Sequence, residues 1–205
     1  MKIKLTNVGK RFNREWIFRA VNYEFITGKC YAITGSNGSG KSTLLQIIAG
    51  ATLFNEGKIQ YQVDDKNIHA EKIYENISIA APYLELVEEM TLIEFLHFHA
   101  SLKKWLPSFN TKKIISIINL EDAAQKQIRN FSSGMKQRVK LAQAIFSDTD
   151  AILLDEPCTN LDEDGIKLYR NLINNYCTNR LLIISSNDNQ EYNFCNEVIE
   201  MNNYK

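Results

Sequence analysis

The stretch Gly35-Ser36-Asn37-Gly38-Ser39-Gly40-Lys41-Ser42-Thr43 fits the phosphate-binding pattern G-x-x-x-x-G-K-[ST]. A polyphosphate needs many short N–H donors at once, and glycines let the backbone approach it closely because no Cβ intervenes. The backbone amides then form a concave nest for the anion. Lys41 places a positive charge on the β- and γ-phosphates, and the Ser42 hydroxyl can bind Mg²⁺. We therefore predict a nucleotide site along residues 35–43.

The residues on either side place this loop between a strand and a helix. Residues 30–34 read as a short buried strand, and residues 43–49 read as a helix that ends at Gly50. A phosphate bound in the loop would then lie at a helix N-terminus, whose dipole favours negative charge. This context distinguishes the motif from a chance turn of glycine and serine.

Further segments predict an α/β core. Residues 151–154 and 181–184 are continuous apolar runs, which are typical of central parallel strands covered on both faces. A helix predicted at 165–176 joins them into a βαβ unit. Alternating apolar residues predict half-buried strands at 3–8, 21–25 and 57–63. The fold class is therefore α/β, with a P-loop core and a helical insertion at 90–147.

The composition limits the class of protein. The chain has 205 residues, 44% of them hydrophobic, which suffices for a core and for one domain. The formal net charge is zero, so we expect no nucleic-acid partner. Apolar runs are shorter than the ~18 residues of a membrane span and the N-terminus lacks the apolar core of a secretory signal, so we expect a cytosolic protein. Wide spacing without a C-x-x-C pair favours reduced thiols at Cys30, Cys158, Cys177 and Cys195.

A pair of acids follows the predicted strand at 151–154, in the sequence Leu153-Leu154-Asp155-Glu156-Pro157. Open α/β sheets bind ligands at the carboxyl ends of their strands. At that edge Asp155 is placed to hold Mg²⁺ directly or through water, and Glu156 to orient and deprotonate an attacking water. Apolar strands often end in an acid, so this pair takes its meaning from the nucleotide motif.

A second helix begins with small residues, in the sequence Phe131-Ser132-Ser133-Gly134-Met135-Lys136-Gln137-Arg138. Its open amides suit an anion, although an ordinary helix cap explains the same residues equally well. Because the nucleotide already occupies residues 35–43, a second anion site suggests a γ-phosphate presented by another subunit.

The order of these motifs resembles the ATP-binding subunit of ATP-binding cassette (ABC) transporters, over essentially the whole chain. Residues 131–135 resemble the LSGGQ signature, in a variant form similar to subunits that serve ABC-2-type exporters. Residues 159–162, Thr159-Asn160-Leu161-Asp162, resemble the D-loop. Phe12 lies where the family stacks an aromatic ring on adenine, and a strand-edge core residue is the alternative for Phe12.

The resemblance implies a P-loop NTPase fold with a mainly parallel sheet and an N-terminal antiparallel β subdomain. Its α/β core would comprise residues 1–80 and 148–205, and its helical insertion about 85–147. It also implies a homo- or heterodimer that holds two ATP molecules between the P-loop of one subunit and the signature of the other. Charge stabilisation would then be supplied in trans, as P-loop enzymes require.

Site residues follow from the resemblance, with ATP and Mg²⁺ as cofactors. The nucleotide contacts would be Phe12, Gly35, Ser36, Asn37, Gly38, Ser39, Gly40, Lys41, Ser42, Thr43, Ser132, Ser133, Gly134, Met135 and Asp162. The metal ligands would be Ser42 and Asp155, and the catalytic residues Glu156, Lys41 and Asn187.

Two positions depart from the family pattern. The family usually has a Gln about forty residues after the P-loop, whereas here the aligned position is Pro82 or a neighbour, which puts coupling to a membrane subunit in doubt. The family also has a His after the last core strand, where this chain has Asn187. An amide can donate a hydrogen bond to a γ-phosphate but carries no proton or charge near neutral pH. We therefore expect slow but real hydrolysis.

The predicted helical segment also carries aromatic residues and histidines. His97 and His99 are two residues apart and share no helix face, so we expect packing or a wet partner surface there instead of a metal site. A second helix is expected at 112–120. The family docks coupling helices of the permease at residues 83–106. Core packing and a partner-facing patch explain equally well the apolar residues Phe95, Phe98 and Trp105.

The leading interpretation is an ATPase subunit on the cytoplasmic face of a membrane that drives a permease made by another chain. Its size and signature favour an exporter. One alternative is a soluble ABC-type ATPase in a non-transport assembly. Another is a degenerate cassette that binds ATP as a switch and hardly hydrolyses it, as the changes at Pro82 and Asn187 suggest.

Overall fold

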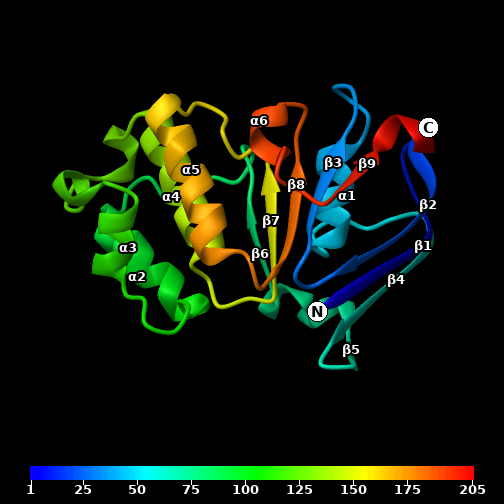
Figure 1. Ribbon diagram of the computed structural model, residues 1–205, viewed down its shortest axis with the longest axis horizontal. Helices are drawn as coiled ribbons and strands as arrows, with labels where there is room; N and C mark the ends of the chain where they lie inside the picture. The colour runs from blue at the N-terminus through cyan, green and yellow to red at the C-terminus, as the bar shows by residue number, and fades with distance from the viewer.

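A parallel sheet lies at the centre of the computed structural model, which describes residues 1–205 (Figure 1). Its strands follow the order β6-β7-β8-β3-β9, and a separate antiparallel sheet has the order β2-β1-β4-β5. The parallel strands are β3 (Cys30–Thr34), β6 (Ile77–Ala80), β7 (Ala151–Asp155), β8 (Leu181–Ser185) and β9 (Glu197–Glu200). The antiparallel strands are β1 (Lys2–Phe12), β2 (Glu15–Ile26), β4 (Glu56–Val63) and β5 (Lys66–Ile68).

The parallel sheet forms because its central strands are apolar on both faces. Successive side chains of β7 point to opposite sides, so Ile152 and Leu154 join the core beneath the helices. Ala151 and Leu153 join a second core, between the two sheets and α1 (Lys41–Ile48). In both cases burial removes apolar surface from water, which is the main favourable term in folding. The predicted α/β fold class is confirmed.

Helices occupy the side of the molecule away from the antiparallel sheet (Figure 1). They are α2 (Leu92–Leu102), α3 (Thr111–Ile117), α4 (Ser133–Ile145) and α5 (Glu163–Tyr176), with the short α6 (Asn189–Tyr192) after β8. The third helix is shorter than the predicted 112–120 because Asn119 adopts a left-handed conformation (φ +55°), which ends a helix. No helix in the structure is both long and apolar enough to cross a membrane.

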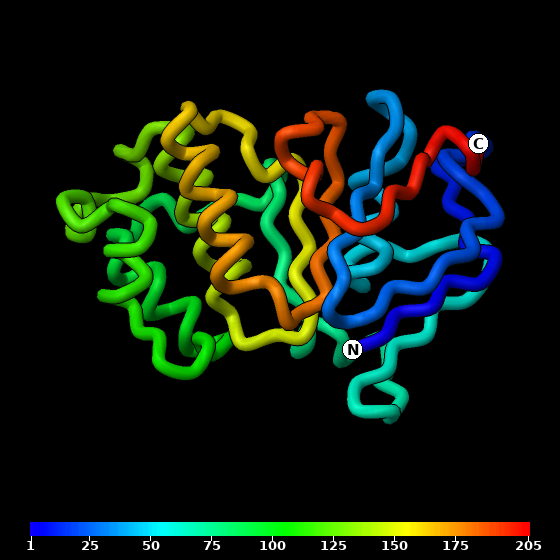
Figure 2. Tube along the Cα trace, in the orientation of Figure 1, coloured from blue at the N-terminus to red at the C-terminus, as the bar shows by residue number.

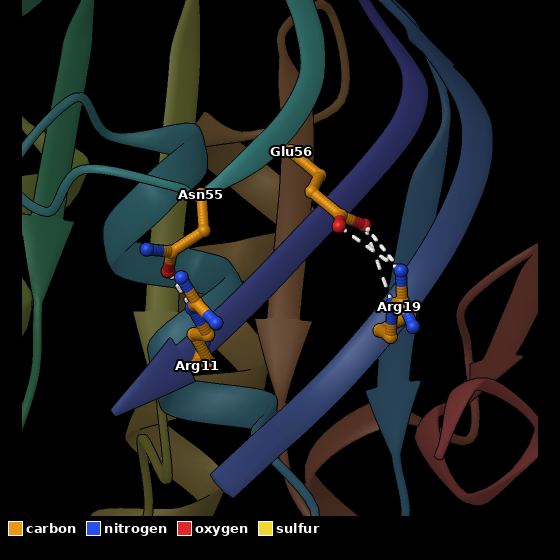
Figure 3. A network of polar contacts seen from close by, with 4 residues as sticks. All are labelled: Arg11, Arg19, Asn55 and Glu56. Atoms are coloured by element: carbon orange, nitrogen blue, oxygen red, sulfur yellow. Dashed lines mark hydrogen bonds and ion pairs between the residues drawn. The ribbon is translucent and has the colours of Figure 1, made fainter. Parts of the chain in front are cut away.

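A polar network stiffens the outer face of the antiparallel sheet (Figure 3). Arg19 on β2 reaches across β1 and donates to both carboxylate oxygens of Glu56 on β4. The Trp16 ring lies within 4.1 Å of the Arg19 guanidinium and 5.5 Å of that of Arg11. The backbone N–H of Arg11 donates to Asn55 at 2.9 Å. These contacts fix the end of β1, next to Phe12.

The two edge strands of the parallel sheet were not predicted from the sequence, nor was β5 at the edge of the antiparallel sheet. The parallel edge strands are β6 and β9, which pair in parallel with β7 and β3. After β9 the short helical turn Met201–Tyr204 lies against β2 (Figure 2).

The expectation of four reduced cysteines is wrong for two of them. Cys30 and Cys195 form a disulfide, with their Cα atoms 4.6 Å apart across 165 residues of sequence. The pair meets because Cys30 begins β3 and Cys195 precedes the neighbouring β9, a pairing that sequence spacing does not reveal. Cys158 and Cys177 are buried free thiols, as expected.

Candidate nucleotide site

The P-loop connects β3 to α1 at the carboxyl edge of the parallel sheet. At Gly40 the backbone is left-handed (φ +98°), and a Cβ there would lie 2.7 Å from Ile17 Cγ2 and 2.8 Å from Phe18 Cδ1. Only glycine fits this position without displacing β2. Inside the loop, the Lys41 ammonium donates to the carbonyl oxygens of Gly35 at 2.8 Å and Ser36 at 3.3 Å. The loop is therefore closed around a buried positive charge.

The first turn of α1 offers donors to an anion. Gly40 is its N-cap and supplies no side-chain cap, so the first amides keep their hydrogen-bonding capacity. No acidic residue lies in that turn. A cavity of about 380 Å³ opens here, lined by Gly38, Gly40, Lys41, Ser42 and Glu156 among others. Its donors and charge fit a polyphosphate.

Asp155 ends β7 and is buried beside this cavity. Its Oδ1 has no hydrogen-bond partner, which is costly for a buried oxygen. Burial raises the pKa of Asp155, while the nearby hydroxyls of Ser185 and Ser42 and the charge of Lys41 oppose the rise. An unpaired carboxylate oxygen beside a serine hydroxyl fits Mg²⁺, which is bound by oxygen ligands.

Glu156 follows Asp155 and is exposed, with a left-handed backbone (φ +44°). Its N–H donates to the carbonyl oxygen of Ser185 at 2.8 Å. Thr159 Oγ1 lies 3.5 Å from Glu156 Oε2. The carboxylate therefore lines the same cavity as Lys41 and Ser42, although β8 lies between β7 and the strand that leads into the P-loop.

Asn187 joins the same edge from the end of β8. Its Oδ1 accepts from the backbone N–H of Gly35 at 3.3 Å, and its Nδ2 donates to Asn37 Oδ1 at 3.2 Å. The residue thus contacts both the start and the tip of the P-loop. Sequence reasoning had placed Asn187 only near a phosphate.

Phe12 lies apart from the cavity-lining residues, at the end of β1. The residue is 52% exposed, and the Lys10 ammonium lies 4.6 Å from the ring centroid. Ile17 on β2 lines the phosphate cavity instead. An exposed aromatic ring can stack on a base.

The signature segment, residues 131–135, lies at a different cavity from the P-loop. Ser132 caps α4 by accepting from the Met135 N–H at 3.2 Å. A cavity of about 480 Å³ is lined by Ser132, Ser133, Gly134, Met135, Asn160, Asp162 and Arg138, among others, and shares no residue with the P-loop cavity. Asp162 also caps α5 by accepting from the Gly165 N–H at 2.8 Å. Within one chain, the signature does not reach the P-loop.

The segment after β6 contains Pro82, which the sequence analysis discussed, and Tyr83, whose place near the site it missed. The carbonyl oxygen of Pro82 accepts from the Lys140 ammonium at 2.9 Å, so the backbone at this position is held against α4. Burial raises the pKa of the neighbouring Tyr83, whose hydroxyl lies beside Gln46 and close enough to Asp155 to feel its charge. The only signal in the sequence was an aromatic residue one place after Pro82.

The side chains of His97 and His99 lie in different surroundings, as their spacing of two residues predicts. His99 Nε2 lies 2.9 Å from Ser147 Oγ, and its ring stacks on Trp105 with centroids 4.8 Å apart. Burial, with a smaller contribution from the Lys103 charge, lowers the pKa of His99 to about 4. His97 is exposed. Among the aromatic residues of this segment Phe95 is buried, whereas Phe98 is exposed.

Fold and site together define a P-loop nucleotide-binding protein. The family model described as ABC transporter matches residues 18–159, and the chain belongs to that family. An uncharacterized ABC transporter ATP-binding protein of Bacillus subtilis, YybJ, is 30% identical over 98% of this chain and 92% of its own length. The chain is therefore an ATP-binding subunit of an ABC transporter and an ATPase.

Solved structures share the fold. A putative ABC transporter ATP-binding protein from Pyrococcus furiosus superimposes with a TM-score of 0.82 at 21% identity, covering all of both chains. The dimeric post-hydrolysis state of the ATP-binding cassette MJ0796, bound to ADP and Pi, gives a TM-score of 0.80 at 23% identity over 97% and 93% of the two chains. Subunits of this class dimerise and work with membrane permeases.

Proposed function

We propose that Mg-ATP binds along residues 35–43 and that Glu156 activates the water that hydrolyses it. The observation that carries the proposal is the meeting of Lys41, Ser42 and Glu156 around one cavity, with Asp155 buried beside it. Lys41 would pair with the β- and γ-phosphates, and Phe12 would stack on adenine. Mg²⁺ bound by Ser42 and Asp155 would neutralise charge on the phosphate oxygens.

In the reaction, Glu156 takes a proton from water as the water oxygen attacks the γ-phosphorus. The bond between that phosphorus and the bridging oxygen breaks, which releases ADP and phosphate, and the proton passes to solvent. Asn187 donates to the γ-phosphate from the opposite side of the P-loop. Its amide supplies a hydrogen bond without the charge of an imidazolium, so turnover is slow.

A second subunit completes each site. The residues Ser132, Ser133, Gly134 and Met135 would contact the γ-phosphate held by the partner's P-loop, with Asp162 at the same interface. Two observations support this: the separate cavity at the signature, and the amides of Ser133 and Gly134 at the start of α4, which stay free because the Ser132 side chain caps only the Met135 N–H. ATP binding would close the dimer and hydrolysis would reopen it.

The partner beyond the dimer is a permease made by a separate chain, at the cytoplasmic face of a membrane. The cassette comprises a core at 1–80 and 148–205 with an insertion at about 85–147. Relatives named for export and for import both occur, so the direction rests on the Met135 signature variant, which favours export.

The test is ATPase turnover of the purified protein beside Glu156→Gln, with the size of both measured with and without Mg-ATP. We expect a loss of about 100-fold or more in the variant, because a general base contributes about 10²–10⁴-fold. We also expect the variant to form an ATP-dependent dimer. Equal turnover in the two proteins would refute the role of Glu156.

An ATP-dependent switch is the second candidate. The departures at Pro82 and Asn187 favour it, since one removes a side chain that contacts the nucleotide site in relatives and the other removes a titratable group. A switch binds ATP and dimerises with no turnover in either wild type or Glu156→Gln. Co-purification with a membrane protein would favour the transport subunit, and co-purification with RNA or DNA the non-transport assembly.

A further inference from the structure

Glu191 on α6 is a buried carboxyl outside the proposed chemistry. It is 4% exposed, its Oε1 accepts from the backbone N–H of Cys158 at 2.6 Å, and its Oε2 has no partner. Burial raises the pKa of Glu191, the charges of Asp188 and Glu156 add to the rise, and hydrogen bonds from Ser186 and Cys158 oppose it. A carboxyl in such surroundings is costly, so its contact with Cys158 needs a reason.

The contact lies two residues after Glu156. Glu156 has a left-handed backbone, which a side-chain-bearing residue adopts only where its neighbours enforce it. One neighbour is the carbonyl oxygen of Ser185, which accepts from the Glu156 N–H. The turn that follows closes with the Thr159 N–H donating to the Glu156 carbonyl at 3.1 Å. Glu191 holds this turn from its other side, through Cys158.

Glu191 itself is held in place by the core. The Tyr169 hydroxyl, fully buried on α5, donates to the backbone carbonyl of Glu191 at 2.7 Å. A helix as short as α6 has little stability of its own, so it depends on such contacts. A cavity of about 380 Å³ lined by Asn37, Glu156, Asn187 and Glu191, among others, opens between these loops.

We propose that Glu191 is a positioning residue that fixes Glu156 relative to Asn187, by tying the turn after β7 to the segment after β8. The inference rests on the proposed role of Glu156 as general base. Its consequence is specific: without the bond to Cys158, the Glu156 side chain is still present but is no longer held in its orientation.

The experiment compares steady-state ATPase kinetics of two variants with the wild type. Glu191→Met fills the same space without an acceptor, and we expect kcat to fall about 10- to 100-fold because misplacing a catalytic group by about 1 Å has that effect. KM for ATP stays within about twofold, since the P-loop is unchanged. Glu191→Gln keeps a carbonyl acceptor for Cys158 and restores kcat to within about threefold.

A control variant and Glu156→Gln separate the possible outcomes. Ser78→Ala removes another buried hydroxyl contact, to the Ala144 carbonyl, on β6, where Ser78 is in register with Ile152 of β7 and not with the end of that strand, and leaves kcat unchanged. Wild-type kcat in Glu191→Met would overturn the inference, provided that Glu156→Gln is inactive. An active Glu156→Gln would instead overturn the proposed function. If Glu191→Met does not fold, Glu191→Asp, which shortens the acceptor, gives the same test: wild-type kcat in it also overturns the inference.

Discussion

Adding one methyl group to the P-loop should have very different effects at Gly38 and at Gly40. Both glycines are left-handed, with φ of +77° and +98°. A Cβ at Gly38 would meet nothing within 4 Å, whereas one at Gly40 would lie 2.7 Å from Ile17 and 2.8 Å from Phe18. The two substitutions therefore share a backbone cost and differ in a steric cost.

The magnitudes follow from these two costs. A left-handed conformation costs an alanine about 1–2 kcal/mol relative to glycine. Overpacking a buried contact adds about 1–3 kcal/mol, because carbon atoms prefer to lie about 3.5–4.0 Å apart. We expect Gly38→Ala to lower the free energy of unfolding by about 1–2 kcal/mol, and Gly40→Ala by about 2–5 kcal/mol. The gain from a stiffer unfolded chain is the same in both and cancels in the difference.

Urea unfolding of the nucleotide-free protein, followed by circular dichroism, measures both values. The unfolding slope should stay constant, so that a change in midpoint reports stability alone. Equal free energies of unfolding in the two variants would refute the steric argument, since it requires the contact of Gly40 with β2 to be close in solution. A larger loss in Gly38→Ala would refute it as well.

Three further outcomes are expected. Asn187→His should raise kcat for ATP hydrolysis, because imidazole adds a titratable donor, and equal or lower turnover would count against a residual switch role. Phe12→Ala should weaken ATP binding about 5- to 150-fold in calorimetric titrations, a stacking contribution of about 1–3 kcal/mol, with pyrophosphate binding unaffected. The free energy of unfolding should decrease as pH falls from about 6.5 to about 4, because the folded state holds the pKa of His99 at about 4 and resists its protonation. His99→Gln should flatten that part of the pH profile, and an unchanged slope would assign it to other groups.

The nucleotide motif and the acid pair could be predicted because neighbouring residues determine their geometry. Three glycines, a lysine and the start of a helix are enough to form an anion nest. The strands at 151–154 and 181–184 were predictable because continuous apolar runs suit the centre of a parallel sheet. Both are local properties, so one sequence is sufficient to find them.

The edge strands could not be predicted, for a physical reason. Strand β6 has four residues and includes buried Ser78, whose hydroxyl is satisfied by Ala144 on a distant helix. Strand β9 begins and ends with glutamate, and Val198 between them is 57% exposed. Ile77, Ile79 and Ala80 of β6 are apolar, but four residues are too few for periodicity to distinguish a strand from a helix, and in β9 the apolar residues Val198 and Ile199 are adjacent. Each becomes a strand because a partner already present in the sheet offers hydrogen bonds.

The orientation of the Asp155 and Glu156 side chains is harder to predict from the sequence. The motif specifies that two carboxylates follow an apolar strand, and the structure then treats them differently: Asp155 is buried and unpaired, whereas Glu156 is exposed and left-handed. That difference is imposed from β8 and α6, where Ser185 and Glu191 bond the backbone on either side of Glu156. The presence of the two carboxylates is therefore set by the local sequence, whereas their orientation is set by tertiary contacts. A cassette could keep both acids and still lose hydrolysis through a change at Glu191.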